Sequence, residues 1–224
     1  MDNFFTKAFE NAPDEVKESI YKDLILNNNS DYCKQLRMQY YKKVLKHMGE
    51  NVYIDKDVKI TNPQWVSLGD NVTIHSGAVL LARGEGGITI GNNSRIKDNV
   101  LLDTETADRG YIKIANNVYI GTGTTLFGHN GLEIGEFSLI AQNVTCTPYS
   151  HIFTDPNSTI YGQGGHSKKV TIGPDAYIGM GVDIMYSGDV GKGSVVGSGS
   201  VVVKPIPPYS VAVGNPAKVI KERK

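Results

Sequence analysis

Aliphatic residues recur at every sixth position along most of this 224-residue chain. Each is usually followed by Gly, Ala or another short residue, then by two polar or glycine positions, and then by Ser, Val, Ala or Thr. An amphipathic helix would need apolar spacing near ~3.6 and few glycines, so the pattern argues against one. It predicts a solenoid of stacked repeats instead. The clearest run is Ile172, Ile178, Ile184, Val190, Val196 and Val202.

The repeats fall into sets of three, and insertions of variable length separate the sets. Seven sets can be counted, with insertions of 2, 4, 6, 2, 20 and 0 residues between them. No insertion falls within a set, as expected if each set is one coil of three sides and extra residues loop out at one corner. The glycines and the pairs Asn92–Asn93 and Asn116–Asn117 suit tight corners, because Gly and Asn tolerate a positive φ. The prediction is an all-β parallel β-helix of about seven three-sided coils. The earlier sets are Met48, Ile54 and Ile60; Leu68, Ile74 and Leu80; Ile90, Ile96 and Leu102; Ile114, Ile120 and Leu126; and Ile134, Ile140 and Cys146.

The ends of the chain differ from the repeats. Residues 1–47 read as a helical segment, with one helix expected over 13–27 and a second capped by Ser30. These helices are expected to cover the first coil, which would otherwise expose an open β edge. Residues 48–204 form the predicted β-helix with a loop insertion at 147–171, and residues 205–224 form a C-terminal cap. The second helix is predicted to pack through a stripe of Leu36, Tyr40, Val44 and Met48.

Charge and cysteine content exclude several classes of function. The 23 basic and 23 acidic residues balance, so nothing in the bulk charge points to nucleic acid or an anionic membrane as a partner. No signal peptide or transmembrane segment is expected, which predicts a cytoplasmic protein. Cys33 and Cys146 are far apart and lack a CxxC pattern, so neither a disulfide framework nor a metal site is predicted. Cys146 takes an aliphatic core position and is rejected as an acyl-carrying nucleophile.

His151 lies in the longest insertion, within CTPYSHIFTDPNSTIYGQGGHSKK. Long loops in a compact domain are usually functional, and imidazole is suited to accept a hydroxyl proton near neutral pH. His151 is therefore the candidate general base, the alternative being a loop histidine with no chemical task. Asp155 is the one acid in the insertion. His166 closes the loop and reads as a surface residue, a cofactor contact or an acceptor contact.

These features together resemble a known family. The hexapeptide runs, the insertion that contains Ser150-His151 and the closing GSGSVVVKPIPPYSVAVGNPAKVI are similar to the galactoside and maltose acetyltransferases of the left-handed β-helix superfamily. The resemblance covers roughly residues 48–221. It implies a left-handed coil, a homotrimer with an active site between each pair of neighbouring prisms, and acetyl-CoA lying along the last coils.

The resemblance also implies a set of cofactor-binding residues. Tyr177 stands where such enzymes often have Trp beside the pantetheine, and Gly179 and Met180 supply the backbone near the thioester. Met180 replaces a Ser of some relatives, so oxyanion stabilisation there falls to a main-chain N–H. Small corner residues and solvated lysines would also occur in any such prism. The remaining implied contacts are Gly197 and Ser198 along the cofactor, and Lys204, Lys218 and Lys221 near its phosphates.

The resemblance is weaker for the residues that would bind the acceptor. His129 stands where galactoside acetyltransferases carry an acid for the acceptor sugar, and Gly121 replaces their Asn, so the identity of the acceptor does not carry over. His129, Asp103 and Tyr149 are the predicted acceptor contacts; the segment around Asp103 is charged, as a solvated loop also would be.

These features are consistent with three functions. The leading hypothesis is O-acetylation of a sugar or glycan intermediate by direct transfer from acetyl-CoA. The second is N-acetylation of an amino sugar nucleotide, whose amine needs less help from a base. The third is a noncatalytic β-helix used in assembly. A metal-bearing hydratase is disfavoured, because His75, His129 and His151 do not form a recognisable ligand set.

Overall fold

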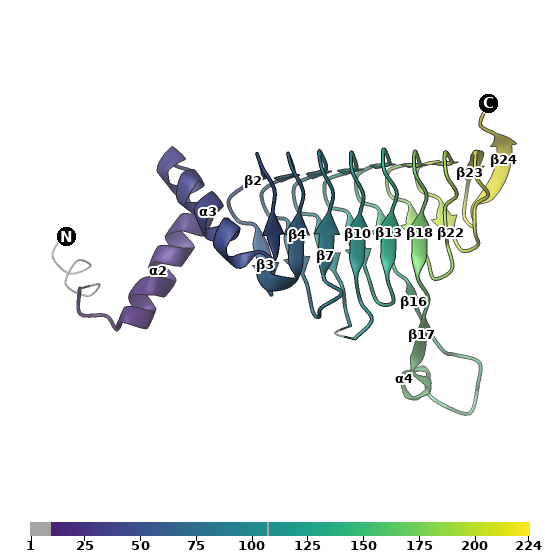
Figure 1. The fold of residues 1–224 in the computed structure, drawn as a ribbon. Helices are drawn as coiled ribbons and strands as arrows, with labels where there is room; N and C mark the ends of the chain where they lie inside the picture. Colours follow the sequence, from purple (N-terminus) through teal and green to yellow (C-terminus); the bar gives the residue numbers. More distant parts are fainter. Residues whose placement is uncertain (1–9, 107) are drawn as a thin grey trace.

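The hexapeptide positions line the inside of a three-sided prism, shown from the side in Figure 1. A computed structural model describes residues 10–106 and 108–224, so the first nine residues of the predicted helical segment lie outside the described part. Three parallel sheets, here called faces A, B and C, form the sides of the prism. This is the all-β, left-handed parallel β-helix that the sequence and its resemblance predicted, and the count of about seven coils is confirmed.

The strands of each face are two to five residues long and follow one another from coil to coil. Face A holds β1 (His47–Met48), β4 (Val66–Leu68), β7 (Ile88–Ile90), β10 (Ile112–Ile114), β13 (Leu132–Ile134) and β18 (Val170–Ile172). Face B holds β2 (Tyr53–Ile54), β5 (Thr73–Ile74), β8 (Arg95–Ile96), β11 (Tyr119–Ile120), β14 (Leu139–Ile140), β19 (Tyr177–Ile178), β21 (Val195–Val196), β23 (Ser210–Val213) and β24 (Lys218–Glu222). Face C holds β3 (Lys59–Thr61), β6 (Val79–Leu81), β9 (Leu101–Asp103), β12 (Thr125–Phe127), β15 (Thr145–Cys146), β20 (Asp183–Ile184) and β22 (Val201–Val202).

Each set of three places one side chain on each face, and sets stack in register. Ile120, for example, pairs with Ile96 in the coil before and with Ile140 in the coil after, and all three are fully buried. The residues just before most strands of faces B and C are also buried. Buried hydroxyls among them bridge to the next coil; Ser94, for example, donates to the carbonyl of Ala115 at 2.9 Å and accepts the N–H of Val118. The core is therefore a column along the prism axis.

The corners between the faces are called AB, BC and CA. At corner AB, four asparagines with φ between 55° and 59° stack on one another: Asn51, Asn71, Asn93 and Asn117. Their side-chain amides form a ladder, each donating to the next at 3.0 to 3.2 Å. The left-handed backbone at these turns explains why Asn recurs there.

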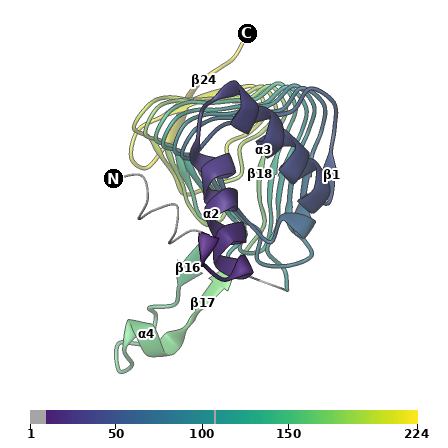
Figure 2. The same ribbon diagram turned by 90° about the vertical axis from the view of Figure 1, so that its left-hand side faces the viewer.

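All the inserted residues emerge at corner CA. They include η1 (Pro63–Trp65) and, in the longest insertion, an arm made of β16 (Tyr149–His151), α4 (Ile160–Gln163) and β17 (Gly165–Ser167). β16 and β17 form an antiparallel hairpin that projects from the prism, as Figures 1 and 2 show from two directions. The sequence predicted a loop here, whereas the structure has a strand pair at its base.

Within the described residues, two helices precede the first coil, α2 (Asp14–Asn27) and α3 (Asp31–Val44), and Figure 2 shows α3 lying across the end of the prism. Ser30 caps α3 as predicted, accepting the N–H of Cys33. The predicted apolar stripe is confirmed in part: Tyr40, Val44 and Met48 pack against the core, but α3 ends at Val44 and Met48 belongs to β1. The side chains that α3 buries are Cys33, Arg37 and Tyr41.

Arg37 is the buried residue of α3 that hydropathy would not predict. Its guanidinium is fully buried and donates to main-chain carbonyls of Ile25 and Asn28 near the end of α2 and of Ile54 in the first coil, at 3.0 to 3.1 Å. A charged residue thus joins both helices to the prism by satisfying carbonyls at their junction.

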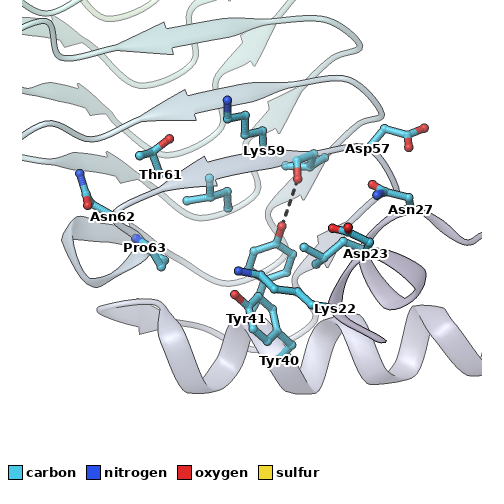
Figure 3. A pocket seen from close by; sticks show the side chains of 13 residues that line it. Lys22, Asp23, Asn27, Tyr40, Tyr41, Asp57, Lys59, Thr61, Asn62 and Pro63 are labelled. Atoms are coloured by element: carbon cyan, nitrogen blue, oxygen red, sulfur yellow. Dashed lines mark hydrogen bonds between the residues drawn. The ribbon is translucent and has the colours of Figure 1, made fainter. Parts of the chain in front are cut away.

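A pocket of about 640 Å³ opens beside this junction, between α2, α3 and β3. Figure 3 shows Lys22, Tyr40, Tyr41 and Lys59 on its walls, with the Tyr41 hydroxyl donating to the carbonyl of Val58 at 3.2 Å. None of the sequence-predicted site residues lines it.

The C-terminal residues begin as an eighth coil. Ile206 bridges in parallel to Val190 on face A, and β23 extends face B. β24 then folds back antiparallel on β23, and all five of its residues are exposed. An outer strand rich in charge resists pairing with another chain at this edge. In the described residues, no helix is both long and apolar enough to span a bilayer.

Candidate active site

His151 lies at the base of the arm, at the end of β16. In the hairpin register it is directly opposite Gly165, while Tyr149 is opposite Ser167. Residues 149, 151 and 165 therefore share one face of the hairpin, and residues 150 and 166 share the other. The imidazole of His151 is exposed, and no hydrogen bond to its ring is found among the described residues.

Three rings line up at the base of the arm. The ring of Tyr149 stacks on the imidazole of His129, with centroids 4.9 Å apart and planes inclined by 21°. The same tyrosine ring meets the His151 imidazole edge to face, at 5.1 Å and 87°. Two predicted acceptor residues and the predicted base are thus brought together by the structure.

The opposite face of the hairpin makes a second ring contact. The imidazole of His166 packs edge to face on Tyr186 at 4.5 Å. Tyr186 belongs to the CA corner that follows β20, one coil beyond the arm. The sequence analysis did not single it out, since an aromatic residue in a solvent-facing corner carries no distinguishing spacing.

Asp103, the third predicted acceptor residue, is held by Arg83. Two hydrogen bonds of 2.7 Å join the guanidinium to the two carboxylate oxygens, and the N–H of Glu105 donates to the same carboxylate at 2.8 Å. Burial alone would raise the pKa of Asp103, but these hydrogen bonds and the charge of Arg83 outweigh it, so the pKa is lowered. Both carboxylate oxygens of Asp103 already accept hydrogen bonds, and the solvent-exposed member of the pair is Arg83, whose side chain is 47% exposed.

His129 sits between this ion pair and the arm. Burial lowers its pKa, and the nearby charges of Glu105 and Asp103 only partly oppose that shift. Its Nδ1 is buried and has no hydrogen-bond partner among the described residues. A lowered pKa keeps the imidazole neutral at neutral pH.

Gln163 organises the tip of the arm. Its side chain accepts the N–H of Asp155 and donates to the carbonyls of Asp155 and Ser158, at 3.0 to 3.2 Å. The carboxylate of Asp155 accepts the N–H of Asn157 instead of reaching the His151 imidazole. The sequence did not indicate this role for Gln163, because hydrogen bonds from a side-chain amide to main-chain atoms of a loop leave no periodic pattern.

The predicted cofactor residues lie elsewhere on the prism. Tyr177 and Lys221 are on face B, whereas Gly179, Met180, Gly197 and Ser198 form corner BC, with Lys218 beside them. Lys204 follows β22 at corner CA and is separated from the others. A single chain therefore keeps His151, at corner CA, on a different corner from the main cofactor group.

The glycines at corner BC are required by the stacking itself. A Cβ on Gly179 would lie 2.6 Å from the main-chain nitrogen of Ser198, and one on Gly197 would lie 2.7 Å from Val213. Their small size leaves a flat corner beside an apolar groove of about 360 Å³ on face B, lined in part by Tyr119, Leu139 and Tyr177. The exposed cations of β24, Lys218 and Lys221, lie at the end of this face. Face B thus carries an apolar groove over β11, β14 and β19 and, beyond β21 and β23, the cations of β24, an arrangement that fits a long donor with a phosphorylated end.

The described residues contain no group of three or more His, Cys, Asp or Glu side chains placed to hold a metal ion.

No family model matches the chain. WbbJ of Escherichia coli, provisionally named a lipopolysaccharide biosynthesis O-acetyl transferase, is 31% identical over 147 residues, which are 62% of this chain and 74% of WbbJ. The chain belongs to the hexapeptide-repeat acetyltransferases.

Other relatives of this hexapeptide-repeat protein match over a smaller share of their length. The galactoside O-acetyltransferase of Escherichia coli is 34% identical over 136 residues, 60% of this chain and 63% of that enzyme. A protein of Mycobacterium tuberculosis named a probable acetyltransferase is 33% identical over 170 residues, 74% of this chain and 54% of that protein. The chain spans a little over half of the length of several such relatives.

Among solved structures, AntD, an N-acyltransferase from Bacillus cereus, superposes with a TM-score of 0.61 at 24% identity. The match covers 84% of this chain and 89% of AntD. At this identity the likeness concerns the fold of the hexapeptide-repeat family alone.

Proposed function

We propose that this protein transfers an acetyl group from acetyl-CoA to a hydroxyl of a sugar or glycan intermediate, with His151 as the general base. The observation that carries the proposal is the exposed imidazole of His151 on a strand that is braced against the prism by ring contacts. The names of the galactoside O-acetyltransferase and WbbJ relatives support a hydroxyl as the acceptor.

The chemistry follows from the properties of the groups. Bound acetyl-CoA would supply the activated acetyl thioester. A sugar hydroxyl is not ionised at neutral pH, so the His151 imidazole takes its proton as the new C–O bond forms. The C–S bond then breaks, and the imidazolium returns the proton to the departing thiolate. His129, kept neutral by burial, and the fixed Arg83 would orient the acceptor on the same corner.

The separation of corners supports a site shared between copies of the chain. In one prism a full face separates His151, at corner CA, from the predicted cofactor residues on face B and corner BC, so the two groups cannot act on one donor within the same chain. The cofactor residues in question are Tyr177, Gly179, Met180, Gly197, Ser198, Lys218 and Lys221. We therefore propose a homotrimer in which corner BC of one copy faces corner CA of its neighbour. Lys204 lies at corner CA and would reach the phosphates from that side. The proposed donor also places the reaction in the cytoplasm.

N-acylation of an amino sugar nucleotide is the second candidate. AntD, whose fold matches, is an N-acyltransferase seen in complex with dTDP-4-amino-4,6-dideoxyglucose and coenzyme A. The test is a thiol-release assay with acetyl-CoA across mono-, di- and nucleotide sugars, including amino sugars. Release with hydroxyl acceptors supports the proposal, release only with amino sugars favours N-acylation, and no release with any acceptor favours a noncatalytic prism.

A further inference from the structure

We propose that Tyr149 is a positioning residue that fixes where the His151 imidazole stands. The proposal rests on the proposed function, in which His151 is the base. It does not depend on how the acceptor binds, because the contacts concerned lie within the arm and at its junction with the prism.

The first step is the empty cross-strand position. Gly165 lies directly opposite His151 in the hairpin and has no side chain to pack against the imidazole. The ring of Tyr149, the diagonal neighbour of Gly165, fills that space instead. A Cβ at position 165 would overlap the hydroxyl and the ring carbon of Tyr149, so Gly165 is the residue that lets the ring lie there. Tyr149 thereby supplies the surface against which His151 rests.

The second step is the connection to the rigid prism. His129, on which Tyr149 stacks, belongs to the preceding coil, and Thr106 donates a hydrogen bond of 2.7 Å to its carbonyl. Phe127 adds an edge contact to the His129 ring at 5.9 Å. The path from the core to His151 therefore runs through two aromatic contacts, each of a kind that has a preferred geometry.

A second ring contact holds the hairpin from its opposite face. His166, on the opposite face of the hairpin, packs on Tyr186 two coils beyond His129. The base of the arm is thus held between two ring pairs. No hydrogen bond to the His151 ring is found in the described part of the chain, so packing is the means left to orient it. Misplacement of a base by about 1 Å can lower the rate of a reaction about 100-fold.

The experiment compares Y149F, Y149A and G165A by their kcat and by KM for each substrate. Y149F keeps the ring and should stay within about threefold of the wild-type kcat. Y149A should lower kcat about 10- to 100-fold while KM for acetyl-CoA changes by less than about threefold. G165A keeps every side chain but displaces the ring, so it should also lower kcat. In the Y149A background, G165A should cost less than it does alone, because the ring it displaces is gone.

A readout that does not depend on turnover separates this proposal from the proposed function. The imidazole proton resonances of His151, assigned by their absence in H151A, should carry a ring-current shift that Y149F keeps and Y149A loses. Wild-type kcat in a folded Y149A, or a Y149F as impaired as Y149A, would overturn the positioning role. If H151A retains full turnover while the ring-current shift behaves as expected, the proposed function fails and the positioning of His151 by Tyr149 stands.

Discussion

The ring of Tyr149 stacks on the imidazole of His129 at 4.9 Å, although the two residues are separated by 20 positions and lie in different insertions. The distance has a simple origin. Neighbouring parallel strands lie about 4.8 Å apart, so side chains that leave the same corner of successive coils meet at a separation close to ring stacking. The solenoid therefore aligns the groups of one corner into a column, and His151 joins that column through Tyr149.

The central prediction concerns His151. H151A should lower kcat about 10²- to 10⁴-fold, the range expected for a lost general base, while acetyl-CoA binding is kept. The side chain is exposed on an inserted strand, so its removal leaves no core cavity and thermal unfolding should be unchanged. H47A, which removes another exposed histidine far along the chain, is the matched control and should retain turnover. A folded H151A with near-normal turnover on its best hydroxyl acceptor would contradict the assignment.

A second prediction tests the cations of β24. The double variant K218A/K221A should raise KM for acetyl-CoA more than KM for the acceptor, because both side chains are exposed on β24, at the edge of the face that carries the apolar groove. Added salt should reproduce the defect in the wild type by screening the same charges. K42A/K43A in α3 removes two exposed lysines at the other end of the prism and serves as the control. Equal effects on both KM values would instead indicate a general folding defect.

A third prediction concerns the pair formed by Arg83 and Asp103. D103N should lower the free energy of unfolding by about 1–2 kcal/mol, less than for a buried pair because water reaches half of Arg83. The folded-state pKa of Asp103 is lowered, so its contribution is present above the unfolded pKa of about 3.9 and is lost as pH falls through the folded value. Urea unfolding at pH 7 and at pH 3 should show the difference between wild type and D103N shrinking in acid. E85Q, which changes an exposed acid at the same corner of the prism, should show no such convergence.

A fourth prediction concerns Cys146. Its thiol is fully buried, and burial together with the negative charge of Asp189 raises its pKa to about 12. A thiol reagent at pH 8 should therefore leave Cys146 unmodified in the native protein and modify it once guanidinium unfolds the chain. C146A should keep turnover, which tests the rejection of Cys146 as a nucleophile. Loss of activity with the fold intact would reverse that conclusion.

Sequence reasoning was strongest where the repeat applied. The sets of three identified the inward side chains of every face, because a six-residue side returns a side chain to the axis in each strand. In α3 it was right only in part: Tyr40 and Val44 pack against the core, but the fully buried positions include Arg37. A buried guanidinium that binds carbonyls of α2 and the first coil cannot be read from hydropathy, since its partners are main-chain atoms far along the chain.

The sequence by itself determined the parallel β-helix, its seven coils, the single corner that carries insertions and the presence of His151 and His166 in the longest one. Each of these follows from the spacing between residues, which can be read directly from the sequence. Only the tertiary structure decided that Tyr149 would stand between His129 and His151, that Arg83 would hold Asp103, and that all the predicted cofactor residues except Lys204 would lie away from the corner of His151. Those relationships depend on the stacking distance between coils and on the lengths of the insertions, which set side chains beside one another only when the chain has closed into a prism.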